Sequence, residues 1–167
     1  IIMKKIIIIG AGAMGSAFTV PCLENQNDVT LVGTHLEDDL IKKIKLNKNF
    51  HPALSLELPS KLKIEKFEKL SSILKGEVDI IVVGVSSIGI EWVVTQIAKN
   101  YKKNLPIVLL TKGLAVIENE LTTLSDKIKK LLEEKGHTEV NISEIKGPCL
   151  AAGLANKMRT GTVIANR

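Results

Sequence analysis

The chain has 167 residues, 45% of them hydrophobic and 25% charged, a balance typical of a soluble globular protein of one domain. The net charge of +5 comes from lysines scattered along the chain, and aromatic residues make up only 3%, so the composition indicates a solvated surface rather than a nucleic-acid-binding one. No signal peptide is recognisable, and the longest apolar runs are too short for a membrane span. The two cysteines lack the spacing of a disulfide framework or a zinc site. We therefore expect a cytoplasmic protein without a metal site.

Strand-like and helix-like patterns alternate along the whole chain. The apolar runs Ile6–Ile9 and Ile80–Val85 predict strands buried on both faces of a sheet. Strands are predicted at Lys5–Ile9, Asp28–Val32, Lys63–Glu65 (a weak one), Asp79–Gly84, Ile107–Leu110, Val140–Ile145 and Thr162–Ala165. Apolar residues at helical spacing predict helices at Met14–Asn25, Asp38–Leu46, Leu70–Leu74 and Ile90–Ala98, and a long one running from Leu121 past Leu132 until Gly136 stops it. Residues Asn47–Ser60 are predicted to form a loop. The alternation predicts a Rossmann-type, doubly wound α/β fold with a mostly parallel sheet, as a single domain over residues 1–167.

A glycine-rich loop, Gly10-Ala-Gly-Ala-Met-Gly15, lies between the first predicted strand and the first predicted helix. Gly10 allows the tight turn out of the strand, Gly12 lets a pyrophosphate approach the backbone, and Gly15 lets the helix pack closely on the sheet. The free N–H groups at the start of that helix then face the phosphates. The loop therefore predicts a dinucleotide-binding site.

The choice of dinucleotide depends on the end of the second strand. An acidic residue there usually binds the ribose hydroxyl of NAD, but this strand ends in Val32-Gly33-Thr34-His35. Thr34 and His35 can donate hydrogen bonds to the 2′-phosphate of NADP, whereas Glu37 lies farther along the chain and could still reach a ribose. The sequence thus predicts NAD or NADP as cofactor, with NADP favoured.

Lys112 is the strongest candidate for a residue that acts on substrate. It follows the end of a predicted buried strand, and ligands of open α/β sheets bind at the carboxyl ends of the strands. An ammonium group there can stabilise a carbonyl oxygen that becomes negative as hydride arrives. The alternative interpretation is an ordinary surface lysine at a strand end.

Several motifs in this order resemble the N-terminal domain of NAD(P)-dependent glycerol-3-phosphate dehydrogenases. They are the glycine loop, Val32-Gly33-Thr34, His51-Pro52, Val85-Ser86, Thr111-Lys112-Gly113-Leu114 and Gly147-Pro148-Cys149-Leu150-Ala151. The glycine loop is shared with many enzymes, but Lys-Gly-Leu followed by Gly-Pro-x-x-Ala is far more specific. The resemblance implies interconversion of glycerol 3-phosphate and dihydroxyacetone phosphate by hydride transfer, a reaction that feeds glycerophospholipid synthesis.

The resemblance also implies which residues hold the cofactor. Ala13 and Met14 would contact its phosphates through their backbone groups, and Thr34 would lie beside the adenosine ribose. Ser86 would lie along the cofactor near the end of its strand, and Ala151 would contact it from the last loop.

A second set of residues is implied at the substrate. Lys112 would contact both the nicotinamide side and the substrate, and Gly147 and Cys149 would line the substrate site. Members of this family commonly carry a small hydroxyl residue at the position of Cys149 and phenylalanine at that of Leu150. Because a thiol is a poor hydrogen-bond donor, the departure puts a side-chain contact at Cys149 in question but leaves a backbone contact intact.

The resemblance further implies a second, mostly helical substrate domain that this chain does not contain. That domain would carry the general acid–base lysine and the arginine that binds the substrate phosphate. We therefore expect the fragment alone to be inactive and the full-length protein to be an enzyme. A homodimer is the candidate assembly of the full-length protein. Three alternatives stay open: the cofactor domain of a ketopantoate reductase-like enzyme, a non-catalytic dinucleotide-sensing module, and a naturally short binding protein.

Overall fold

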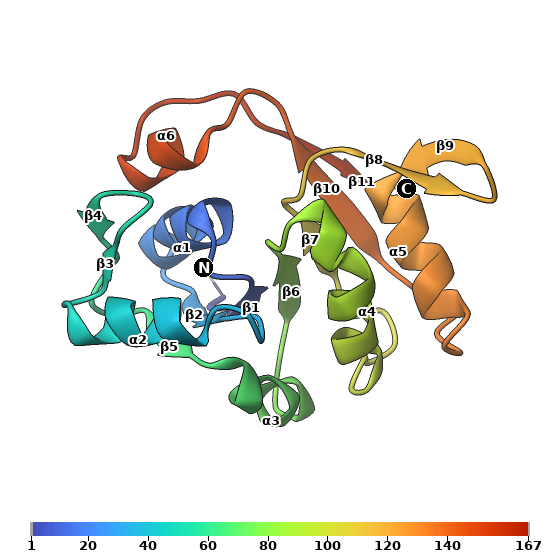
Figure 1. Ribbon diagram of the computed structural model, residues 1–167, viewed down its shortest axis with the longest axis horizontal. Helices are drawn as coiled ribbons and strands as arrows, with labels where there is room; N and C mark the ends of the chain where they lie inside the picture. The colour runs from blue at the N-terminus through green and yellow to red at the C-terminus, as the bar shows by residue number, and fades with distance from the viewer. Residues whose placement is uncertain (1, 167) are drawn as a thin grey trace.

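The computed structural model describes residues 2–166, which form an open seven-stranded sheet with helices on both faces (Figure 1). The strands of this sheet are β1 (Lys5–Ile9), β2 (Asp28–Val32), β5 (Lys63–Glu65), β6 (Ile80–Val83), β7 (Ile107–Leu109), β10 (Ile142–Lys146) and β11 (Val163–Asn166). Their order across the sheet is β11-β10-β7-β6-β1-β2-β5. Neighbouring strands are parallel except that β11 runs antiparallel to β10. The mostly parallel, Rossmann-type sheet predicted from the sequence is therefore confirmed.

Both faces of the sheet are buried under helices. One face is covered by α1 (Ala13–Glu24), α2 (Asp38–Leu46) and α6 (Ala151–Ala155), and the other by α3 (Leu70–Lys75), α4 (Ile90–Ala98) and α5 (Leu124–Glu133). Two single 3₁₀ turns, Phe67–Lys69 and Ser87–Gly89, lead into α3 and α4. The side chains of β1 alternate between the two cores, which explains why its sequence is an unbroken apolar run.

The helix predicted from Leu121 begins later, so that part of the prediction is wrong. Residues Leu114–Ile117 (β8) and Glu120–Thr123 (β9) instead pair as an antiparallel hairpin. Glu118 and Asn119 at its tip both have positive φ, as a two-residue type I′ turn requires. The helix α5 starts at Leu124 because the Thr123 side chain accepts the Asp126 N–H and caps it.

The structure contains three further elements or arrangements that the sequence patterns do not reveal. Within the predicted loop Asn47–Ser60, β3 (Phe50–His51) and β4 (Leu56–Glu57) form a very short antiparallel hairpin. The short helix α6 follows β10 and packs on α1, as Figure 1 shows. The last strand, β11, is exposed along its whole length at the edge of the sheet.

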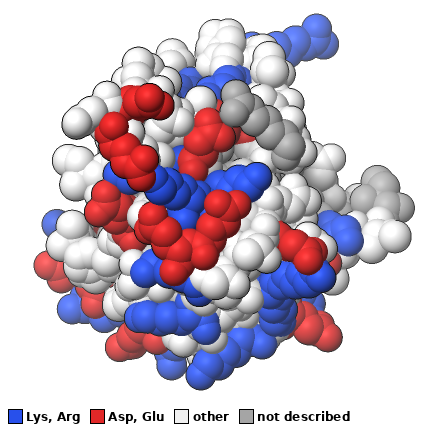
Figure 2. Space-filling model, turned by 90° about the vertical axis from the view of Figure 1, so that its right-hand side faces the viewer, with Lys and Arg blue, Asp and Glu red and all other residues white. Residues whose placement is uncertain are grey.

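Positive and negative side chains are interleaved on the face shown in Figure 2. Some of them form ion pairs between elements, for example Lys127 with Glu91. Among the helices of residues 2–166, none is long and apolar enough to cross a membrane. The same residues contain no group of three or more His, Cys, Asp or Glu side chains placed to hold a metal ion.

Glu144 is a nearly buried carboxylate that ties β10 to the start of α5. One of its oxygens accepts the Ser125 N–H at 2.8 Å, and the other lies 2.9 Å from Nζ of Lys146. Burial raises the pKa of Glu144, but the hydrogen bonds from Ser125 and Lys146 outweigh it and hold the pKa below its usual value. The ionised carboxylate therefore stabilises the fold.

We expect Glu144→Gln to lower the free energy of unfolding at pH 7 by about 1–2 kcal/mol, because the hydrogen bonds to an ionised acceptor are weakened. A carboxyl whose pKa is lower in the folded than in the unfolded protein adds to the free energy of unfolding above its unfolded-state pKa of about 4.3. This added stability is lost as the pH falls through the pKa of the folded state. Urea unfolding at a series of pH values should show a difference between wild type and variant at pH 7 that shrinks as the pH falls through the folded pKa of Glu144. Equal stabilities at pH 7 would contradict this assignment.

Candidate functional site

The site lies where β1 and β6 adjoin in the middle of the sheet, the point at which the chain connections leave in opposite directions. In open α/β sheets, ligands bind in the crevice at the carboxyl ends of such strands. Gly10, which has a φ of +108°, turns the chain out of β1, and a Cβ added to it would lie 2.7 Å from the Gly84 carbonyl oxygen. A Cβ on Gly15 would lie 2.1 Å from the Gly10 oxygen. These glycines let the start of α1 lie directly against the ends of both strands.

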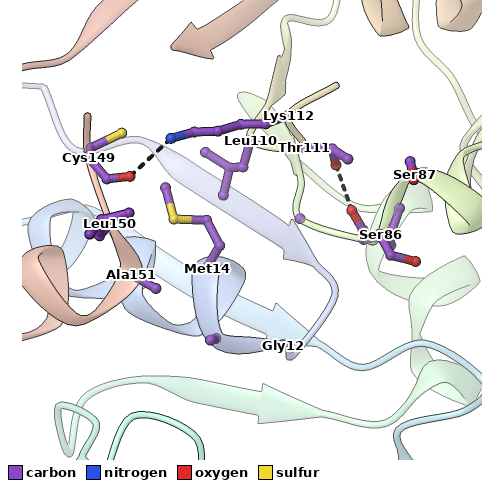
Figure 3. A pocket seen from close by; sticks show the side chains of 13 residues that line it. Gly12, Met14, Ser86, Ser87, Leu110, Thr111, Lys112, Cys149, Leu150 and Ala151 are labelled. Carbon is purple, nitrogen blue, oxygen red and sulfur yellow. Dashed lines mark hydrogen bonds between the residues drawn. The ribbon is translucent and has the colours of Figure 1, made fainter. Parts of the chain in front are cut away.

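A pocket of about 420 Å³ opens at this edge of the sheet (Figure 3). It is lined by Gly12, Ala13, Met14, Gly84, Val85, Ser86, Ser87, Leu110, Thr111, Lys112, Cys149, Leu150 and Ala151. Seven of the site residues predicted from the sequence are among them, from segments more than a hundred residues apart. The predicted residues Gly10, Gly15, Thr34 and Gly147 do not line the pocket.

Gly12 stands at the N-terminus of α1 with open space in front of it. A Cβ added there would meet no atom within 4 Å. No side chain caps this helix and its first turn contains no acidic residue, so the N–H groups of the first turn have no competing side-chain anion. These features fit a diphosphate group held by backbone N–H groups.

Lys112 joins the loop after β7 to the loop after β10. Its Nζ donates to the carbonyl oxygen of Gly147 at 2.9 Å and to that of Cys149 at 3.2 Å, the latter drawn in Figure 3. Next to it, the Thr111 hydroxyl donates to the Val85 carbonyl oxygen at 2.6 Å, which ties the same loop to the end of β6. Three loops are thus held together around the pocket. Cys149 takes part through its backbone, while its side chain is buried.

Glu37 changes the interpretation of the end of β2. Its carboxylate reaches back to that end and accepts the Thr34 N–H at 2.7 Å and the Ala11 N–H at 2.9 Å through the same oxygen. An acidic group therefore does lie at the end of β2, although the sequence has no acidic residue directly after that strand. The argument that favoured NADP rested on that absence, and the structure removes it.

Three aromatic rings gather beside Thr34, and sequence reasoning did not find them as a group. The His35 ring lies 4.8 Å from the Trp92 ring, and the Phe67 ring lies 5.3 Å from Trp92, measured between centroids. They come from three separate segments, so no local pattern could reveal the cluster. Gly84 also escaped sequence reasoning, although a glycine directly after a buried strand is a signal for close backbone approach.

Strand order, glycine loop and pocket together define a nucleotide-binding domain of the Rossmann class. Residues 5–167 match the family model described as the NAD-dependent glycerol-3-phosphate dehydrogenase N-terminus. The chain belongs to this family, which confirms the resemblance predicted from its motifs. The match does not favour a ketopantoate reductase-like enzyme or a sensing module.

Individual relatives agree with the family match. The chain is 33% identical to the NADP(+)-dependent glycerol-3-phosphate dehydrogenase of Archaeoglobus fulgidus, over 95% of this chain and 45% of that protein. It is 31% identical to the glycerol-3-phosphate dehydrogenase [NAD(P)+] of Mesoplasma florum, over 98% of this chain and 47% of that protein. The chain thus spans about half the length of the curated relatives it matches.

Solved structures show the same fold. Glycerol-3-phosphate dehydrogenase from Coxiella burnetii superposes with a TM-score of 0.80 at 24% identity, over 98% of this chain and 47% of that one. The enzyme from Saccharomyces cerevisiae gives a TM-score of 0.75 at 20% identity with the same coverage. At these identities the likeness concerns the fold alone.

Proposed function

We propose that this chain is the cofactor-binding part of an NAD(P)-dependent glycerol-3-phosphate dehydrogenase. The observation that carries the proposal is that Lys112 and residues Cys149–Ala151 meet the open start of α1 in one pocket. A second part of the protein, matching the remaining half of the relatives, would supply the proton-transferring lysine and the arginine that binds the substrate phosphate. The small-molecule substrate, a cytoplasmic location and a homodimer of the complete enzyme belong to the same proposal.

The residues of this chain would bind the cofactor at one end of the pocket and contact the substrate at the other. The backbone N–H groups at the start of α1 bind the diphosphate, and Ser86 and Ala151 line the path toward the substrate. A dinucleotide held there would supply the hydride exchanged with the central carbon of the three-carbon phosphate. Lys112 uses two N–H groups on the Gly147 and Cys149 carbonyl oxygens, and its third can donate to the substrate oxygen that becomes negative.

Dinucleotide binding is the first test. Trp92, the single tryptophan of the chain, lies close to the end of β2, so its fluorescence should change as NADH or NADPH is added. We expect weak but saturable binding to wild type, and at least about tenfold weaker binding, or about 1.4 kcal/mol, to Gly12→Val, because the valine side chain fills the open space at the diphosphate.

Gly153→Val is the matched control for this test, since Gly153 also has open space around it but lies outside the pocket. It should bind like wild type. If wild type binds neither dinucleotide at millimolar concentration, the proposed function is wrong.

The second test concerns the choice between the two dinucleotides. The adenosine ribose binds at the end of β2 in this fold, where the Glu37 carboxylate lies, and a 2′-phosphate there would meet a like charge. We expect Glu37→Gln to raise the affinity for NADPH relative to NADH about fivefold, the equivalent of about 1 kcal/mol of repulsion between partly solvated charges. Asp39→Asn, which removes an exposed carboxylate from the first turn of α2, should leave the ratio unchanged. An unchanged ratio in Glu37→Gln would place the 2′-hydroxyl elsewhere.

The third test concerns Lys112 in the complete enzyme. Lys112→Ala should lower kcat with dihydroxyacetone phosphate about 100-fold while cofactor affinity stays nearly the same, because an oriented charge at the developing oxyanion is lost and the glycine loop is untouched. Lys112→Arg should not restore turnover fully, since the planar guanidinium differs in shape from an ammonium. Lys129→Ala, an exposed lysine on α5, serves as the control.

Steady-state kinetics and direct cofactor titration separate the outcomes for Lys112. Near-normal kcat and KM in Lys112→Ala would make Lys112 a surface lysine at a strand end. Reduction of ketopantoate by the wild-type enzyme, without reduction of dihydroxyacetone phosphate, would refute the substrate.

A further inference from the structure

The backbone of Ala11, in the middle of the glycine loop, is held by side chains from three segments. Its N–H donates to the Glu37 carboxylate at 2.9 Å. Its carbonyl oxygen accepts the Ser16 hydroxyl at 3.1 Å and lies 2.9 Å from Nε2 of His51. Ala11 itself is fully buried. The cofactor loop is therefore fastened by groups that lie outside it.

His51 comes from the short β3–β4 hairpin, which is separate from the main sheet. Its side chain is 1% exposed, and its own carbonyl oxygen accepts the Ser55 N–H at 2.9 Å, so both backbone and ring are fixed. Because a carbonyl oxygen only accepts hydrogen bonds, Nε2 must carry the proton that bonds to Ala11. The other ring nitrogen, Nδ1, is buried and has no hydrogen-bond partner among residues 2–166.

A buried ring nitrogen without a hydrogen-bond partner lowers the stability of the fold, so a histidine is a poor choice for a position that needs only to be filled. A leucine would occupy the same buried position without an unpaired ring nitrogen, since buried polar atoms without partners destabilise a fold. The polar bond that His51 does make is directed to the Ala11 carbonyl oxygen, 40 residues away in the sequence. The ring therefore acts on the glycine loop.

Holding this carbonyl fixes the next N–H group. In a planar trans peptide, the C=O and N–H groups point in opposite directions, so the Gly12 N–H points away from His51. Glycine is conformationally permissive, and a peptide between Ala11 and Gly12 could otherwise rotate at small cost. Gly12 lines the pocket, on the same loop that we propose holds the diphosphate.

We infer that His51 is a positioning residue for dinucleotide binding: its Nε2–H holds the Ala11 carbonyl and thereby presets the glycine loop for the diphosphate. The inference rests on the proposed function, because it assigns His51 a role in that same site. Ser16 and Glu37 hold the same residue from the other sides, and His51 is the member that couples the β3–β4 hairpin to the loop.

Substitutions at His51 test the inference in the full chain. We expect His51→Leu to weaken NADH and NADPH binding about tenfold, the equivalent of one net hydrogen bond, with Trp92 fluorescence as the readout. His51→Gln should bind within about threefold of wild type, because the glutamine amide nitrogen can reach the position of Nε2 and donate. A residue that only stabilises the fold would not show this rescue in affinity.

His137 offers a matched control. Its Nε2 also lies 2.9 Å from a backbone carbonyl oxygen, that of Ala98 at the end of α4. His137→Leu removes the same kind of bond away from the glycine loop, so it should lower the melting temperature without changing dinucleotide affinity. Equal affinity losses in His51→Leu and His137→Leu would overturn the inference.

A measurement on wild type keeps the inference testable if His51→Leu does not fold. Long-range ¹H–¹⁵N correlation spectra of the imidazole rings, assigned with His51→Gln, should show His51 protonated on Nε2 and unprotonated on Nδ1 both before and after NADH is added. A proton on Nδ1 alone would overturn the inference. If wild type binds no dinucleotide, the proposed function is refuted. If wild type binds and His51→Leu has the same dinucleotide affinity, the role of His51 is refuted.

Discussion

At the centre of the sheet, the backbones of Gly10, Gly15 and Gly84 lie in contact with no side chains between them. A Cβ on Gly84 would be 3.0 Å from Cα of Gly15, and one on Gly15 would be 2.1 Å from the Gly10 oxygen. Only this approach places the start of α1 at the ends of both β1 and β6. The open space at Gly12 and the unpaired N–H groups of the first turn follow from that placement.

Hydrogen bonds from side chains to the backbone join the loops around the pocket to one another. Thr111 ties the loop after β7 to Val85, and Lys112 ties it to the loop after β10. On the other side, Glu37 bridges the end of β2 to Ala11. Each bond joins segments that follow different strands, so the shape of the pocket depends on the register of the sheet that brings those strands together.

The sequence predicted the sheet well because parallel strands buried on both faces read as unbroken apolar runs, as in Ile6–Ile9. The sequence predicted element boundaries poorly where a tight turn or a helix cap determines the structure. Apolar residues from Leu121 onward fit a helix, but the positive φ of Glu118 and Asn119 and the cap at Thr123 turn the first of them into a strand. At the site, residues next to strand ends were found by position alone. The contacts of Glu37 and His51 with Ala11 were not predicted, because each is made by a side chain that returns to a distant backbone atom.

The hydrogen-bond partners of Lys112 determine how much of its positive charge can act on a further group. Its hydrogen bonds go to two carbonyl oxygens, and no carboxylate pairs with it among the residues that the structure describes. A carboxylate partner would orient the ammonium but would also neutralise most of its charge toward a third group. Carbonyl dipoles orient the ammonium group and leave its full charge available to a third group. The contacts that position Lys112 are therefore compatible with an electrostatic role, and the buried backbone at Cys149 supplies one of them whatever its side chain is.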